Sequence, residues 1–180
     1  YYWHNDEKVY LSYLNDTYFA ILRQEGTQDL MSSFSSRNAD FQVKEYDTQH
    51  LAKTRELNTF ISAKITGDIA SKYAEDIVYI APYLNGPSGP VGISDRFYIK
   101  LKTPDDINLL RDFAQENGAE IILENFVPLW NTLVCGESSL GNALELANKA
   151  YESGHFEMTD IEFIDDIDWN DSSTYNDTHY

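Results

Sequence analysis

Basic residues, cysteine and long apolar runs are all scarce in this sequence of 180 residues. Thirteen Lys and Arg residues stand against 30 Asp and Glu residues, which gives a formal net charge of −17. Such a chain is a poor candidate for nucleic-acid binding, because phosphate recognition needs concentrated positive charge. A single cysteine excludes an internal disulfide framework and a multi-cysteine zinc site. No apolar run approaches the roughly 20 residues that a membrane-spanning helix needs, so we expect no membrane span.

Catalytic motifs are missing as well. The four histidines, His4, His50, His155 and His179, lie outside any Gly-rich strand-end setting, and no G-x-S-x-G segment occurs. The sequence has neither a P-loop nor a dinucleotide-binding fingerprint. The lone Cys135 lies in an apolar run, which favours a buried structural thiol over a reactive one. We therefore expect a protein that is not an enzyme and that binds no cofactor and no metal.

The composition, 42% hydrophobic and 24% charged, is typical of a folded globular protein. The second half of the chain has the clearest periodicity of apolar residues. Apolar Phe97, Ile99 and Leu101 alternate with Tyr and Lys residues, as in a half-buried strand. Thr103 and Ser139 are each placed to cap a following helix. The predicted elements are strand 97–102, a helix between 103 and 118, strands 121–123 and 129–135, a helix between 139 and 154, and a strand starting near 156. The order β-α-β-β-α-β is that of a ferredoxin-like unit.

The first half repeats this order less sharply. Its predicted elements are strand 18–23, helix 29–36, strands 41–43 and 60–65, helix 68–75 and strand 77–81, preceded by a hairpin within residues 1–13. The pattern indicates an internal duplication at a spacing of roughly 75–80 residues. We therefore predict an α+β fold of two tandem ferredoxin-like units with antiparallel sheets, plus an N-terminal hairpin.

A Gly- and Pro-rich segment predicts the boundary between the two units. Residues 85–92 hold three of the nine glycines and two of the five prolines, a density that neither a helix nor a central strand tolerates. The predicted organisation is the hairpin and first unit at 1–84, a Gly/Pro linker at 85–94, the second unit at 95–163, and an acidic extended tail at 164–180.

The C-terminal part is strongly acidic. The last 26 residues contain eight acidic residues and no Lys or Arg, as in a solvated tail. Asp166, Asp168, Asn170 and Asp177 fit positions 1, 3, 5 and 12 of a calcium loop, but Asp171 stands where that loop needs glycine. A solvated tail is the favoured interpretation, and a calcium site remains the alternative.

Seven segments of the chain carry a family resemblance. They are residues 97–102, 125–130, 141–147 and 151–157, the opening residues 1–3 with 8–11, and the closing residues 176–180. Together they resemble the N-terminal, propeptide-like region of secreted subtilisin-like serine proteases, especially those of Bacteroidetes-type bacteria.

The resemblance implies a role without catalysis. Propeptides of this family are ferredoxin-like domains whose sheet packs on the protease as folding chaperone and inhibitor, and whose C-terminal tail lies in the substrate cleft. For this chain the resemblance implies a subtilisin-like serine protease domain as the partner, in cis or in trans. It also implies a secreted or cell-surface location in a bacterium. Because the sequence opens at Tyr1 without a signal segment, we expect an N-terminal piece to have been removed.

The expected partner-binding residues lie near the C-terminus. An extended tail would bind by strand addition, with apolar side chains in pockets of the partner. Acidic side chains would face helix N-termini of the protease, where negative charge is favoured. The expected residues are Glu157, Asp160, Phe163, Ile164, Ile167 and Trp169.

A second function stays open at this point. The aromatic residues Tyr1, Tyr2 and Trp3 could form a sugar-stacking platform, although aromatic residues also populate ordinary sheet faces. The alternative is therefore a cell-surface module that binds a peptide or a glycan through exposed aromatic side chains.

Overall fold

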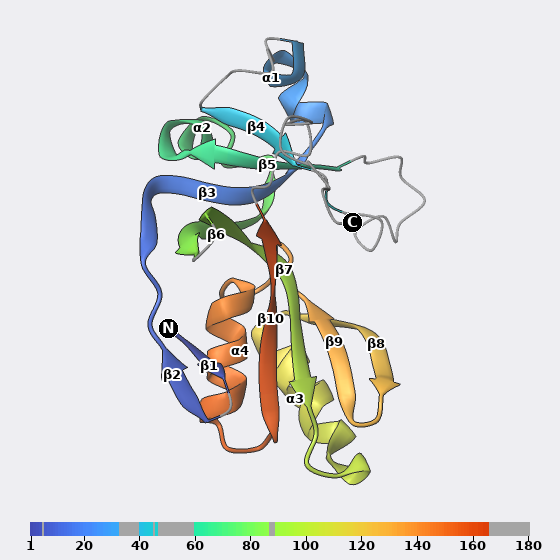
Figure 1. Cartoon of the computed structure of the whole chain (residues 1–180). Coiled ribbons are helices and arrows are strands. Elements are labelled where there is room, and N and C mark those ends of the chain that lie inside the picture. Colours follow the sequence, from blue (N-terminus) through green and yellow to red (C-terminus); the bar gives the residue numbers. More distant parts are fainter. Residues whose placement is uncertain (5, 33–39, 45, 47–59, 87–88, 166–180) are drawn as a thin grey trace, which may run out of the picture.

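The computed structural model describes residues 1–4, 6–32, 40–44, 46, 60–86 and 89–165. Within these residues the chain forms one eight-stranded sheet and one two-stranded sheet, together with four α-helices (Figure 1). The predicted α+β class is confirmed.

Residues 13–86 form the first ferredoxin-like unit. Its elements are β3 (Tyr13–Arg23), α1 (Gln28–Ser32), β4 (Phe41–Lys44), β5 (Phe60–Thr66), α2 (Gly67–Lys72) and β6 (Ile77–Gly86), with a short 3-10 helix (Glu25–Thr27) before α1. The strands lie in the order β4-β5-β3-β6, and neighbouring strands are antiparallel. Helix α1 covers the start of the predicted helix 29–36, and residues 33–36 lie outside the described residues.

Residues 89–165 form the second unit. Its elements are β7 (Gly89–Lys100), a 3-10 turn (Pro104–Asp106), α3 (Ile107–Asn117), β8 (Glu120–Val127), β9 (Trp130–Val134), α4 (Ala143–Glu152) and β10 (Met158–Asp165). The strands lie in the order β10-β7-β9-β8, again antiparallel. This order and connectivity are those of a ferredoxin-like unit, so the predicted tandem arrangement is confirmed.

Local sequence determines where the helices of the second unit begin and end. Thr103, the predicted cap, forms a capping box with Asp106 at the 3-10 turn before α3, and Gly118 ends α3 in the left-handed conformation, with φ of 63°. The cap of α4 is Asn142, whose side chain accepts a hydrogen bond from the Glu145 N–H at 3.0 Å. The predicted cap Ser139 instead donates to the Gly118 carbonyl at 2.8 Å. The loop before α4 is therefore tied to the end of α3.

Residues 85–86 and 89–94 belong to paired strands, which corrects the prediction of an irregular linker over 85–94. Gly86 pairs with Gly89 across the β6–β7 hairpin, and residues 87–88 lie outside the described residues. Pro90 is tolerated because it lies at the start of β7, where few ladder hydrogen bonds are needed. The hairpin joins the sheets of the two units into one.

The two faces of the first sheet contribute to different cores. One face packs on α1 and α2, around the buried Leu22 and Phe41. The opposite face, which carries Phe19 and Tyr83, belongs to the same core as Phe97 in the second unit. The two units therefore share a core, although their architecture is duplicated.

The predicted N-terminal hairpin is present. It consists of β1 (Tyr2–His4) and β2 (Glu7–Val9), with Asp6 at a positive φ of 64° in the turn. The hairpin lies beside α4 (Figure 1). The chain then enters β3 at Tyr13, earlier than the predicted strand 18–23.

Candidate protein-binding surface

The predicted partner-binding residues before and early in β10 lie at the surface. Glu157 is exposed, and its backbone N–H donates to the Lys100 carbonyl at 2.9 Å. Asp160 is exposed and lies opposite Tyr98 on β7. Both carboxylates are available to a partner.

The other predicted residues have different surroundings. Phe163 is 38% exposed, and its ring lies 5.9 Å from that of Tyr2 in the N-terminal hairpin. Ile164 is buried in the shared core, so its side chain is not available for partner binding in this structure. Ile167 and Trp169 lie outside the described residues. The described members of the predicted set therefore do not form one surface.

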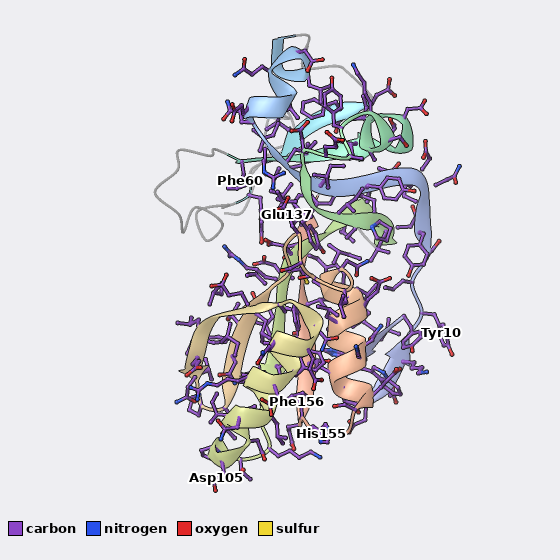
Figure 2. All side chains as sticks on the ribbon, turned by 180° about the vertical axis from the view of Figure 1, so that it is seen from behind. Tyr10, Phe60, Asp105, Glu137, His155 and Phe156 are labelled. Carbon is purple, nitrogen blue, oxygen red and sulfur yellow. The ribbon has the colours of Figure 1, made fainter. Side chains whose placement is uncertain are left out.

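The structure points instead to one side of the second sheet, which we call the open face. Helices α3 and α4 cover the other side of this sheet (Figures 1 and 2). Tyr98 lies between the core residues Phe97 and Ile99, so its side chain points to the open face. No described helix covers that face. The apolar and aromatic residues that lie on it are Tyr98, Leu123, Phe126, Val127 and Trp130.

An irregularity in β8 brings large apolar side chains to the open face. Leu123 pairs with Thr132 and Val127 pairs with Trp130, so three residues of β8 lie opposite a single residue of β9 between these pairs. Asn125, in the middle of this bulge, has a φ of 54°. A bulge bends an edge strand and redirects its side chains. A separate register shift between Ile121 and Leu123 precedes this bulge. Leu123 and Val127 are 50% and 49% exposed, and Phe126, within the bulge, is 45% exposed.

Side-chain amides hold the tip of the β8–β9 hairpin in place. The Leu129 N–H donates to Asn125 Oδ1 at 2.8 Å, and the Asn125 N–H donates to Asn131 Oδ1 at 3.0 Å. Leu129 has a φ of 70°, an uncommon conformation for a residue with a branched side chain. The Leu101 N–H also bonds to the Leu129 carbonyl at 2.9 Å. The open face therefore has a preorganised edge.

The open face is apolar at its centre and charged at its edge. The Tyr98 ring lies 6.1 Å from the Phe126 ring. Partial burial, followed by the nearby Glu162 charge, raises the pKa of Tyr98, so its hydroxyl remains protonated at neutral pH. Charged side chains lie beside this centre on the same face: Asp160 pairs with Tyr98, and Lys100 pairs with Trp130. Such a surface suits a protein partner better than a small charged metabolite.

The N-terminal aromatic residues mainly attach the hairpin to α4. The Tyr1 hydroxyl and the Trp3 indole N–H donate to Glu152 Oε1 at 2.6 and 3.1 Å. The Trp3 ring stacks on Tyr151 at a centroid distance of 4.7 Å. One face of Trp3 is therefore already covered and does not contribute to a sugar-stacking platform.

A mainly apolar cavity of about 580 Å³ lies where the hairpin meets the β6–β7 turn and the end of β10. Phe163 lines it, and Tyr10 stands at its edge with 81% of its surface exposed. Figure 2 labels Tyr10 at the outer side of the molecule. The remaining apolar lining comes from Tyr2, Val9, Leu11, Leu84 and Val91.

The described residues offer little for metal or nucleophilic chemistry. No group of three or more His, Cys, Asp or Glu residues among them could hold a metal ion. Cys135 is buried, as predicted, and burial with the nearby Asp95 charge raises the pKa of its thiol. The calcium-loop positions 166–177 lie outside the described residues. Among the described helices, none has the length and apolar character needed to cross a membrane.

Comparison with known proteins identifies no family. No family model matches the chain, and no curated protein matches it. Among solved structures, the small subunit of acetolactate synthase from Thermotoga maritima is similar, with 12% sequence identity and a TM-score of 0.26. The match covers 84% of this chain and 97% of that one. The strand order and the open face define the chain as a tandem ferredoxin-like protein with an exposed apolar sheet face.

Proposed function

We propose that this chain is a non-catalytic, propeptide-like module that binds a subtilisin-like serine protease domain, in cis or in trans, and inhibits it or assists its folding. In this proposal the open face packs on the protease, and the segment after β10 enters the substrate cleft. The observation that carries the proposal is the apolar side of a ferredoxin-like sheet that no described helix covers. Action outside a bacterial cell or at its surface belongs to the same proposal.

The chemistry of the open face supports a protein interface. Leu123, Phe126 and Val127 expose about half of their surface beside Tyr98, and aromatic and apolar side chains of this kind occupy the centres of interfaces. Covering the exposed half of one such side chain stabilises a complex by about 1 kcal/mol. Several such side chains in one patch can therefore anchor a partner.

The position of β10 supports the proposed contact between the tail and the substrate cleft of the protease. Asp160 lies on the open face, and β10 ends at Asp165, from which the chain continues to residue 180. An extended segment in a protease cleft gains main-chain hydrogen bonds by strand addition, with Ile167 and Trp169 as side-chain anchors. The exposed carboxylates of Glu157 and Asp160 would face helix N-termini of the protease.

The test is inhibition of a panel of purified subtilisin-like proteases, subtilisin among them. We expect Leu123→Gln to weaken inhibition about fivefold to tenfold, because one apolar anchor at the interface is lost. Leu109→Gln is a matched control: this leucine is 40% exposed on α3, on the helix-covered side of the sheet. The control should inhibit as the wild type does. Equal effects of the two substitutions, or no inhibition of any protease, would contradict the proposal.

Truncation after Asp165 tests the tail separately, because β10 stays complete. We expect the truncated chain to inhibit at least about tenfold more weakly, since the main-chain contacts in the cleft are lost. Undiminished inhibition would remove the cleft mechanism and leave the open face as the inhibitory contact.

The apolar cavity favours one second candidate, a cell-surface module that binds peptides. Its lining by Tyr2, Leu11 and Phe163 suits an apolar side chain better than a sugar. A peptide array that binds the wild type but not Tyr10→Ala, without protease inhibition, would favour this candidate.

A further inference from the structure

Strand β6 has an edge that is only partly used. One edge pairs with β3 over residues 77–82. The other edge pairs with β7 only over residues 84–86, beyond which β7 pairs with β9 and β10 instead. Within the described residues, no strand pairs with the second edge of β6 over residues 77–82. We call this stretch the free edge.

The strand register shows which backbone groups point to the free edge. Backbone groups of successive residues in a strand point to opposite sides. The Asn85 N–H bonds to the Ser12 carbonyl, next to β3, so the odd-numbered residues around it face β3. Ile80 and Pro82 therefore face the free edge, and Pro82 has no N–H. Among the described strands, none pairs with β6 on this side at Ile80 or Pro82.

A groove runs along this edge. It has a volume of about 390 Å³ and lies between residues 77–80 and the loop 136–142 that precedes α4. Ser139 ties this loop to the end of α3, and the N–H of Gly136 bonds to Ser139 Oγ at 2.9 Å. The groove therefore has a strand edge on one side and a fixed loop on the other.

The side chains at the groove define what would fit there. Ile80 is 37% exposed on the strand, and Leu140 is 72% exposed on the loop. Glu137 and Glu145 line the groove, and Arg23 forms an ion pair with Glu137. The whole chain has a net charge of −17, which attracts cations over longer distances.

We propose that the free edge of β6 binds an extended peptide segment that carries basic residues alternating with apolar ones. The peptide would add as a strand, accepting a hydrogen bond from the Ile80 N–H and donating to the Ile80 and Pro82 carbonyls. Its apolar side chains would contact Ile80 and Leu140, and its basic side chains would lie in the acidic field of the groove. This site is separate from the open face and does not depend on protease binding.

The probe is a blocked heptapeptide of alternating lysine and valine, compared with the same peptide methylated at alternate backbone nitrogens. Binding to the full chain is measured by calorimetry and by amide hydrogen exchange. We expect saturable binding of the unmethylated peptide, at least about tenfold weaker binding of the methylated one, and slower exchange of the Ile80 amide. The Ala81 amide, which faces β3, should not change.

Ile80→Pro removes the Ile80 N–H from the free edge, and Ile80→Val keeps it. We expect the proline variant to bind the peptide at least about tenfold more weakly and the valine variant to bind as the wild type does. If the proline variant does not fold, the wild type provides the test: the proposal requires that the peptide slows the exchange of the Ile80 amide. No saturable binding up to about 1 mM, or equal binding of the methylated peptide, would overturn the proposal. A dimer of the chain that Ile80→Pro abolishes would also overturn it, because it would assign the edge to a second copy.

Discussion

At the scale of single residues, Gly92 marks a close approach between the two units. A Cβ atom added to it would lie 3.2 Å from Phe19 Cβ and 3.2 Å from Tyr83 Cζ. Both neighbours are fully buried, so neither can move away at low cost. We expect Gly92→Ala to lower the free energy of unfolding by about 1–3 kcal/mol, as overpacking does. Urea unfolding measures the change.

Gly136 provides the matched control. A Cβ atom there would meet no atom within 4 Å, so Gly136→Ala should change the unfolding free energy by less than about 1 kcal/mol. Equal destabilisation by the two substitutions would show that close packing at Gly92 is not the cause.

At the scale of elements, the N-terminal hairpin is attached to α4 through Glu152. Hydrogen bonds from the Tyr1 hydroxyl and then from the Trp3 indole hold the pKa of Glu152 below its ordinary value of 4.5. A lowered pKa means that the folded state favours the carboxylate, so this contact is present above pH 4.5 and is lost as the pH falls through the lowered pKa. We expect the Trp3 indole N–H resonance to shift over that range.

Two comparisons show whether the titration of Glu152 causes the shift of the Trp3 resonance. The Trp130 indole, on the open face, should not follow the same titration. Glu152→Gln removes the titrating group and should abolish the shift of the Trp3 resonance. A Trp3 resonance that titrates unchanged in Glu152→Gln would show that another group controls the hairpin.

Elements with a clear local pattern were predictable from the sequence. The alternation through Phe97 and Ile99 indicated β7, and the capping residue Thr103 and the terminator Gly118 delimited α3. The β6–β7 hairpin was not predictable from composition, because it depends on where each glycine and proline falls in the register. Gly86 and Gly89 face each other at its turn.

The candidate surface was less accessible to sequence analysis. Asp160 could be placed at the surface, whereas Ile164 is buried by packing between distant segments. The place of Phe126 beside Tyr98 on the open face depends on the bulge at Asn125. The nearest indication in the sequence was Tyr98, an outward position in a strand whose neighbours are apolar.

At the scale of the whole molecule, the shared core couples two units that could in principle fold separately. The face of the first sheet that carries Phe19 and Tyr83 is covered by the second unit. Separating the units would expose this face to water, which is unfavourable in proportion to the apolar area. We therefore expect the two units to unfold together.

Phe19→Ala tests this coupling, because Phe19 lies in the first unit and its side chain is fully buried in the shared core. The substitution should lower the free energy of unfolding by about 3–5 kcal/mol. Native-state hydrogen exchange measures the free energy of opening at each amide. We expect the same decrease at the Ala63 amide of the first unit and at the Phe97 amide of the second, because a single cooperative transition governs both. Phe126→Ala, on the open face, should cost less than about 1 kcal/mol. Faster exchange confined to Ala63 would mean that the units unfold independently.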